Sequence, residues 1–192
     1  MGNREDLLAG ARKAILERGV AKTTARDIAT AAGVSLAAIG YHFGSKERLI
    51  TEALAEALGS GIGDSMEALI RDTTGKPLLE AFAQMWDGMP EVLENNREGM
   101  LASLENLLRV ARTPESQEFM TDSLTGAYAD IAHALQQAHP ELDQDVARAI
   151  AELYFVLTQG LGVLWMITRG KNLPDGARLT EAIAVLAQDL RT

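Results

Sequence analysis

Apolar residues recur at intervals of three and four along most of the chain, which is the period of a helix packed on one face. The first such segment runs from Leu7 to Arg18 and ends at Gly19. No segment alternates apolar and polar residues as a strand does, and no Asn-Gly or Asp-Gly hairpin turn occurs. The residues that dominate are good helix formers. The pattern therefore predicts an all-α protein.

Two short helices are predicted next. Thr24 precedes Asp27 by three residues, an acidic form of the capping box that starts a helix near Ala25 and ends it at Gly33. Ser35 is expected to cap the following helix. Such a pair forms either an ordinary helical hairpin or a helix-turn-helix, whose second helix enters the major groove of DNA.

Glycine and other small residues are expected to set the ends and the crossing of the helices in this front region. Gly44 is expected to end the third helix, and Ser45 to cap a fourth helix with the sequence KERLITEALAEAL. Small residues at Ala29 and Gly33 are expected to let the two short helices cross closely. The pattern therefore predicts a compact helical domain at the front of the chain.

Prolines divide the rest of the chain. Since proline fits the first turn of a helix but not its interior, each proline is expected to separate two helices. A further break is expected near Asn95-Asn96, and the chain should hold about nine to ten helices. The prolines are Pro77, Pro90, Pro114, Pro140 and Pro174.

Composition limits the class of protein. The 192 residues include no cysteine, which excludes a disulfide scaffold, a cysteine-ligated metal site and thiol catalysis. The start lacks the apolar run of a signal peptide. The most apolar stretch, Leu153 to Ile167, contains Thr158 and Gln159 and is judged too short and too polar to span a membrane. We expect a soluble cytoplasmic protein with no membrane partner.

Charge is distributed unevenly along the chain. Residues 1–50 hold 8 Lys/Arg and 5 Asp/Glu, whereas residues 51–192 hold 10 Lys/Arg and 22 Asp/Glu. A basic front and an acidic back indicate two tasks on one chain, although an excess this small also arises by chance.

The run ILERGVAKTTARDIATAAGVSLAAIGYHFGSKERLI resembles the N-terminal DNA-binding domain of the tetracycline-repressor (TetR/AcrR) family. The resemblance implies a homodimeric, ligand-responsive transcriptional regulator, usually a repressor, that binds a palindromic double-stranded DNA operator. It implies a helix-turn-helix DNA-binding domain of three helices in residues 1–50. Residues 51–192 would form a helical domain for effector binding and dimerisation.

The resemblance also assigns DNA contacts residue by residue. Thr24 and Lys46 match phosphate contacts, Tyr41 and His42 match a backbone clamp, and Arg26 is expected to add groove or backbone contacts. The front of the recognition helix faces base edges through Ser35, Leu36, Ala37 and Ala38. Gly40 departs from the family, which commonly has Tyr there. No Arg, Asn or Gln lies between Ser35 and Tyr41, so bidentate base readout is not available and apolar contacts with thymine methyls are expected.

A pocket for a mainly apolar effector is expected after the fourth helix, because adaptable methionines gather there with tryptophan. An ordinary helical core is the alternative for each residue. The candidates are Met66, Met85, Trp86, Met89, Met100, Leu104, Asn106 and Arg109.

A dimer interface is expected in the last two long helices, since one of them is apolar on two faces and needs a second cover. The family resemblance places its dimer contact there as well. The candidates are Leu124, Tyr128, Ile131, Leu135, Val156, Gly160 and Val163.

An enzyme is not expected. His42, His133 and His139 form no metal-ligand spacing, and neither a GxSxG motif nor a phosphate-binding loop occurs. No cofactor or metal is expected. A helical adaptor that binds other proteins without specific DNA binding is the alternative function. The sequence does not identify the effector, the operator or the direction of regulation.

Overall fold

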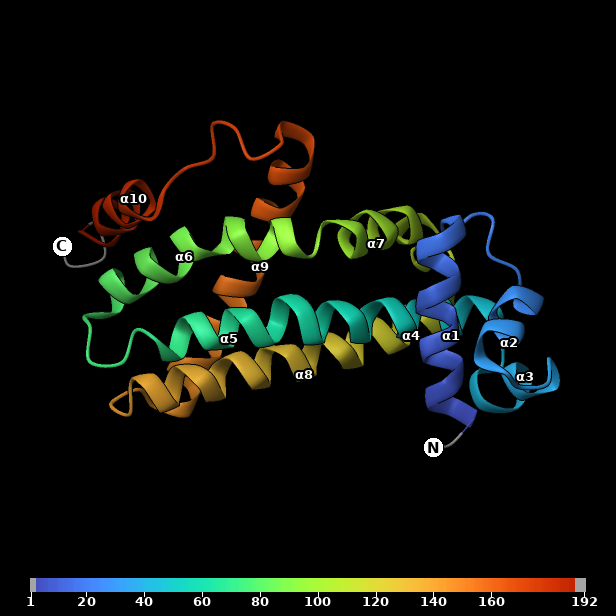
Figure 1. The fold of residues 1–192 in the computed structure, drawn as a ribbon. Coiled ribbons are helices and arrows are strands. Elements are labelled where there is room, and N and C mark those ends of the chain that lie inside the picture. Colours follow the sequence, from blue (N-terminus) through green and yellow to red (C-terminus); the bar gives the residue numbers. More distant parts are fainter. Residues whose placement is uncertain (1–2, 189–192) are drawn as a thin grey trace. The chain divides into compact units, whose positions relative to one another are not determined.

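The computed structural model describes residues 3–188 (Figure 1), which contain ten α-helices and one π-helical turn but no strand. This confirms the all-α prediction. By their internal contacts the residues divide into two compact units. The first unit runs to Ser60 and resumes over Arg97–Thr125, and the second contains Gly61–Asn96 and the described residues from Gly126 onward.

The first unit is built around a three-helix head on the start of a longer helix. Its core is continuous from the head into α4 and reaches α7 through Ala102. The buried centre includes Leu7, Ile28, Leu49 and Ile50. Its helices are α1 (Asn3–Arg18), α2 (Ala25–Ala32), α3 (Ala37–Phe43), α4 (Lys46–Leu58), α7 (Arg97–Val110) and the first part of α8 (Pro114–Ala138).

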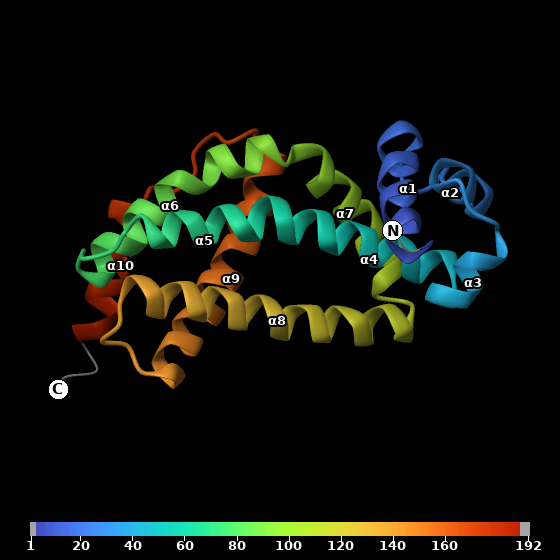
Figure 2. The ribbon, with the colours of Figure 1, turned by 60° about the horizontal axis from the view of Figure 1, so that its bottom comes forward.

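The second unit contains the remaining helices. A π-helical turn, η1, over Gly59–Gly63 joins α4 to α5 and coincides with the boundary between the units. Figure 2 shows the same helices from a second direction. The unit contains α5 (Asp64–Arg71), α6 (Leu78–Asn95), the rest of α8, α9 (Gln144–Thr168) and α10 (Gly176–Gln188).

Proline positions predict most of the helix boundaries, with one error. Pro77 precedes α6, Pro114 begins α8, and α6 gives way to α7 at Asn96 as expected. Pro90, however, lies inside α6 rather than at its end. A proline inside a helix destabilises it by about 3 kcal/mol. Apolar residues buried on both sides of Pro90, among them Met89 and Leu93, stabilise α6 by packing.

The close crossing in the head joins α1 and α2 through Gly10, whereas the prediction placed it between α2 and α3 at Ala29 and Gly33. A Cβ on Gly10 of α1 would lie 2.8 Å from both the Cβ and the backbone nitrogen of Ala32 on α2, and 2.9 Å from the carbonyl oxygen of Ile28. Gly33, by contrast, has open space at its Cβ and a φ of +67°. Gly33 therefore ends α2 by adopting a left-handed conformation, and Gly10 is the residue that lets two helices touch.

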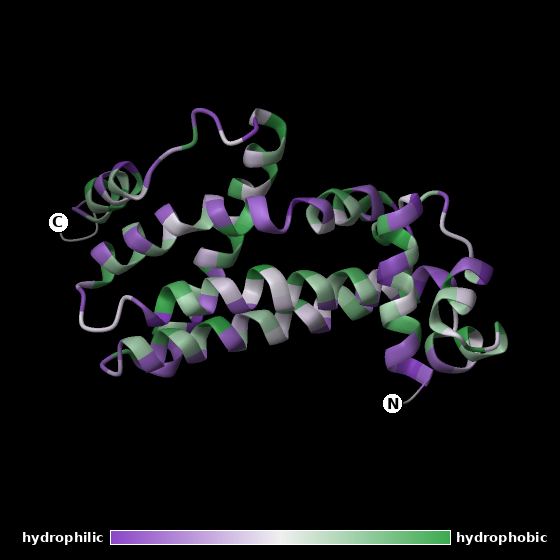
Figure 3. Ribbon diagram, viewed as in Figure 1, coloured by the Kyte–Doolittle hydropathy of each residue, from purple (hydrophilic) through white to green (hydrophobic). Residues whose placement is uncertain are grey.

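The apolar segment near the C-terminus is longer than the sequence argument assumed. Helix α9 has 25 residues and a mean hydropathy of 1.6 over its most apolar window, of which 33% is buried. Several of its turns are coloured as hydrophobic in Figure 3. Length and composition therefore do not exclude a membrane span, contrary to the prediction, although a core helix of a water-soluble protein meets the same criterion.

Candidate nucleic-acid interface

A complete capping box begins α2. The Thr24 hydroxyl accepts a hydrogen bond from the Asp27 amide at 3.2 Å and donates one to Asp27 Oδ2 at 2.6 Å, and the Thr24 amide donates to the same oxygen at 2.9 Å. These bonds to the Thr24 hydroxyl and amide, helped by the Arg18 guanidinium, lower the pKa of Asp27. The predicted start of α2 is confirmed.

The capping box limits how Thr24 can meet a phosphate. Its hydroxyl and its amide already donate to Asp27. Within residues 3–188 the next two amides of the helix, those of Ala25 and Arg26, have no acceptor. The positive end of the helix dipole and these amides can receive a phosphate oxygen. The Arg26 side chain is exposed beside them.

Helix α3 has an inner and an outer face. Ile39 and Phe43 are buried in the core, and so is Ala38, at 8% exposure. Ala37, Gly40 and Tyr41 recur at intervals of three and one and share the opposite, exposed face. Ala38 was expected to face base edges; because its side chain packs inward, that expectation is wrong for this residue.

The residues just before α3 are exposed and remain candidates for base contact. Ser35 and Leu36 both lie at the surface, and Leu36 is 51% exposed although it is apolar. The prediction that Ser35 caps α3 is wrong. Leu36 occupies the cap position, no side chain caps the helix, and the Ser35 carbonyl accepts a hydrogen bond from the Ala38 amide at 3.1 Å.

Tyr41 is the most prominent side chain of the outer face. It is 86% exposed, and its ring contacts the ring of His42 edge to face at 4.8 Å between centroids. Gly40 beside it has no atom within 4 Å of a built Cβ. The phenol therefore projects from a face on which its neighbour offers no side chain. This geometry suits contact with a DNA backbone or groove wall.

Lys46 links the start of α4 to the segment before α2. Its Nζ donates to the carbonyl oxygen of Thr23 at 3.1 Å and lies 3.7 Å from a Glu47 carboxylate oxygen. The side chain remains 24% exposed. Ser45 caps the helix through the Arg48 amide, as predicted. Lys46 can thus present a charge close to the beginning of α2.

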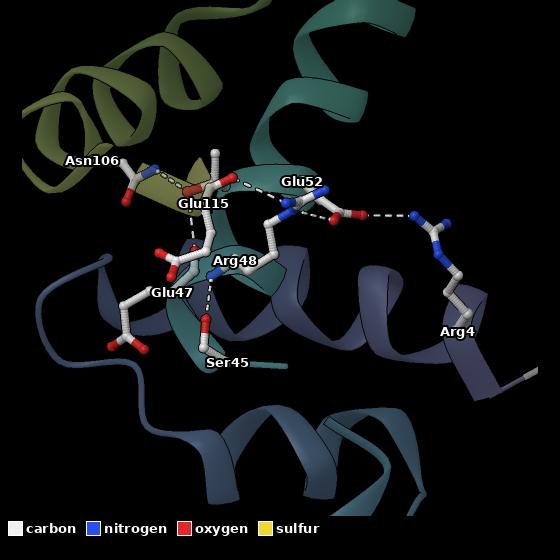
Figure 4. A network of polar contacts seen from close by, with 8 residues as sticks. Arg4, Ser45, Glu47, Arg48, Glu52, Asn106 and Glu115 are labelled. Carbon is white, nitrogen blue, oxygen red and sulfur yellow. Dashed lines mark hydrogen bonds and ion pairs between the residues drawn. The ribbon is translucent and has the colours of Figure 1, made fainter. Parts of the chain in front are cut away.

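Sequence reasoning missed a polar network that joins the head to α8. Arg48 donates to the Glu52 carboxylate and to the carbonyl oxygen of Glu115 at 3.0 Å (Figure 4). Its guanidinium also lies over the Phe119 ring at 4.7 Å. Glu52, only 8% exposed at its side chain, accepts from Arg4 of α1 at 2.6 Å. Residues more than 40 positions apart are tied together, which no local pattern reveals.

Helix α7 holds the head at a second place. The Glu105 carboxylate accepts hydrogen bonds from the Val20 and Ala21 amides at 3.3 and 2.9 Å, in the turn between α1 and α2. Asn106 donates to the Thr51 hydroxyl at 3.1 Å. Helices α7 and α8 are therefore attached to the three-helix head within one unit, by polar contacts in addition to the apolar core.

The predicted effector residues divide between the two units. Met66, Met85, Trp86 and Met89 are buried in the second unit, where the Trp86 indole N–H donates to the Pro174 carbonyl oxygen at 2.8 Å. The first unit contains Met100, Leu104, Asn106 and Arg109, of which Leu104 is exposed.

The surroundings of Trp86 are aromatic. The Phe82 ring lies 5.9 Å from the Trp86 ring and 5.2 Å from the Tyr154 ring, and burial raises the pKa of Tyr154. The Thr158 hydroxyl lies 4.0 Å from the sulfur of Met66. The second unit thus has an interior of aromatic and thioether groups with few polar ones.

The predicted dimer residues differ in exposure. Val156, Gly160 and Val163 are exposed on α9. Tyr128 is partly exposed and packs edge to face on Phe155 at 5.2 Å between centroids. Leu124 is partly exposed in the first unit. Ile131 and Leu135, at 4% and 1% exposure, are buried within the chain, so neither offers a surface to a partner.

Within residues 3–188 no three His, Asp or Glu side chains are grouped to hold a metal ion.

Residues 7–59 match the family described as bacterial regulatory proteins, tetR family. The chain is 44% identical over 188 residues to the HTH-type transcriptional regulator TtgR of Pseudomonas putida, covering 92% of this chain and 83% of that protein. A shorter match, 38% identical over 81 residues, links it to the HTH-type transcriptional repressor KstR2 of Rhodococcus jostii. That match spans 42% of this chain and only 40% of the length of KstR2.

A solved structure with the same fold is the multidrug binding protein EbrR, complexed with proflavin. The TM-score is 0.63 with 20% identity, and the alignment covers 96% of this chain and 99% of EbrR.

Proposed function

This chain belongs to the tetR family of bacterial regulatory proteins, and we propose that it is a cytoplasmic, homodimeric repressor that binds a palindromic operator and is released by a small apolar effector. The observation that carries the proposal is the exposed outer face of α3. Leu36 and Ala37 are exposed at its start and Tyr41 is exposed farther along it, and two backbone amides at the start of α2 are open. An α-helix of this kind fits the major groove, and open amides at a helix start fit a phosphate.

The proposed contacts fall into two groups. Leu36 and Ala37 contact base edges, chiefly thymine methyls, because neither can form a hydrogen bond through its side chain. Arg26, Tyr41 and Lys46 contact the backbone, which positions the head without reading sequence. Ser35 and His42 lie at the two ends of α3 and add polar contacts. The operator is therefore read with few hydrogen bonds from side chains to bases.

Selection of bound sequences from a random DNA pool tests this function. Since a two-fold dimer presents two identical recognition helices, the expected result is an inverted repeat. A pool that shows no enriched sequence, with the protein folded by circular dichroism, would contradict specific DNA binding and favour the adaptor alternative.

The dimer is proposed to form through the exposed face of α9. Val156, Gly160, Val163 and Ile167 recur at spacings of four, three and four, and Ile167 is 71% exposed. Apolar faces of this length are normally covered by a partner. Gly160 has open space at its Cβ, which would allow a second helix to approach closely.

A charge on this face should separate the subunits. Val163→Asp is expected to convert a dimer into a monomer in sedimentation analysis, because an unpaired carboxylate would be buried in the interface. Glu152→Asp, an exposed conservative change on the same helix, is the control. A variant that stays dimeric would move the interface away from α9.

We propose that the effector occupies the interior of the second unit around Met66, Met85 and Met89. Thioether side chains repack around ligands of different shape, and the related fold of EbrR is that of a multidrug binding protein. Proflavin is a suitable probe. Trp86→Ala should change the proflavin concentration that releases operator DNA. Met89→Leu, which conserves volume, serves if the first variant does not fold. A folded variant that releases operator DNA at the same proflavin concentration as the parent protein would contradict this site.

A further inference from the structure

Helix α7 and the turn after it carry an open hollow that the proposed function does not use. Its volume is about 300 Å³, and its lining consists of Glu105, Leu108, Arg109, Arg112 and Thr113. All five residues belong to the first unit, so the hollow lies within one compact body. Two arginines, one carboxylate and one leucine give it both charge and an apolar edge.

The arginines of the hollow have unused donors. Arg109 Nη1 is sealed from solvent and has no acceptor within residues 3–188. In the same part of the chain, the Arg112 side chain forms no hydrogen bond or ion pair. Buried donors are rarely left unpaired, and a buried guanidinium N–H is costly without a partner. Arg109 and Arg112 therefore line the hollow as two cations, and neither is paired with a carboxylate in the described part of the chain.

The acid in the lining is already engaged. The Glu105 carboxylate accepts from the Val20 and Ala21 amides in the turn before α2, and no ion pair joins it to Arg109 or Arg112. A ligand anion can therefore pair with Arg112 and with the guanidinium nitrogens of Arg109 other than the sealed Nη1. A guanidinium matches a carboxylate with two parallel hydrogen bonds.

We propose that this hollow is a binding site for a small organic anion, namely a carboxylate on an apolar chain. The carboxylate binds Arg109 and Arg112, and the chain packs on Leu108, which is 67% exposed. A singly charged group fits better than a doubly charged phosphate, because Glu105 lines the same hollow and repels negative charge.

The site is connected to DNA binding through Glu105. An anion placed beside this carboxylate disfavours its charged contact with the Val20 and Ala21 amides, so occupation of the hollow loosens the turn that leads into α2. Operator affinity then falls, and by reciprocity the operator weakens anion binding by the same factor. This regulatory step rests on the proposed function, whereas anion binding itself does not.

Calorimetric titration of the full chain with sodium octanoate tests the site. Arg109→Gln should weaken octanoate binding about tenfold, as expected for loss of a charge-assisted hydrogen bond. Arg112→Gln should weaken it severalfold, because Arg112 is exposed, and Glu105→Gln should tighten it. Arg97→Gln removes an exposed arginine of the same helix outside the hollow and is the matched control. Equal binding by Arg109→Gln, Arg97→Gln and the parent protein would overturn the site.

Two further arms separate the alternatives. 1-Octanol carries the same chain without the charge, so octanol binding that matches octanoate binding would identify an apolar site instead. Saturating octanoate should weaken operator binding at least threefold in the parent protein but not in Arg109→Gln. If Arg109→Gln instead lowers operator affinity without octanoate and reduces its salt dependence, Arg109 is a phosphate contact and the proposal fails. If no operator can be selected, the proposed function is contradicted, but calorimetry still tests whether the hollow binds an anion.

Discussion

The same substitution at two glycines of the head should have opposite effects on stability. In Gly10→Ala the added methyl meets Ala32 and the Ile28 carbonyl oxygen of α2 at 2.8–2.9 Å. Two of these neighbours are backbone atoms, so no side-chain rotation relieves the contact. In Gly40→Ala the methyl has open space, with no atom within 4 Å.

The magnitudes follow from two opposing terms. Alanine favours a helix over glycine by about 1 kcal/mol, and forcing a methyl group into a packed interface costs about 1–3 kcal/mol. The second term dominates at Gly10, where α1 and α2 must separate, so we expect a loss of about 1–2 kcal/mol of unfolding free energy. Gly40→Ala has only the first term and should gain about 0.5–1 kcal/mol.

Urea unfolding followed by circular dichroism measures both changes, and for a chain of this size each kcal/mol corresponds to about 2–4 °C in thermal midpoint. Since the substitution is identical, unfolded-state effects largely cancel between the two variants. The two variants should differ by at least about 1.5 kcal/mol, which is the sum of the smaller expected effects. Equal stability, or a stabilised Gly10→Ala, would refute the close crossing of α1 and α2.

Two further predictions concern the contacts at the start of α2 and α4. Lys46→Ala should lower affinity for every DNA sequence by a similar factor, because the lost contact is to phosphate; fluorescence anisotropy on operator and scrambled DNA measures this, with Lys76→Ala as the control. A change in sequence preference would contradict it. Asp27→Asn should destabilise the protein at neutral pH, since the folded state holds the pKa of Asp27 below its usual 3.8. The stabilisation is present above that usual value and disappears as the pH falls through the lowered pKa. The unfolding free energies of the parent protein and Asp27→Asn, measured from pH 7 to 2, should therefore converge in acid. A difference in unfolding free energy that stays constant over this range would argue against the capping box.

Local features of the head were predictable because they depend on residues close in sequence. The capping box of Thr24 and Asp27 is confirmed, and so is the cap at Ser45. Each needs only a side chain and an amide three residues later. The same reasoning failed at Ser35, where the chain enters α3 with no side-chain cap. There Leu36 occupies the cap position, and Ile39 one turn into the helix is buried in the core.

Features that depend on distant residues were not predictable. The close approach at Gly10 requires knowing that Ala32 lies against it, and the inward direction of Ala38 follows from how α3 packs. The bond between Glu105 and Ala21 joins residues 84 positions apart. Such pairs are determined by tertiary packing, and a single sequence carries no local signal for them.

The long helices illustrate the same limit. Spacing predicted apolar positions in α8 but not which face is covered by the chain itself, so Leu135 was assigned to an interface although it is buried. The exposure of Val156 and Val163 on α9 could be anticipated from a helix that is apolar on two faces. Proline likewise predicted boundaries except at Pro90, where packing outweighs the lost hydrogen bond.

The central claim is that the outer face of α3 reads DNA sequence, and a repeated selection with an altered face tests it most directly. Ala37→Asn places an amide on that face, and Asn pairs with the major-groove edge of adenine. Random-pool selection should then enrich adenine at one position in each half of the inverted repeat, at equal distances from its centre, while Lys46→Ala retains the parent sequence. An Ala37→Asn variant that binds tightly and selects the same sequence as the parent protein would contradict the account.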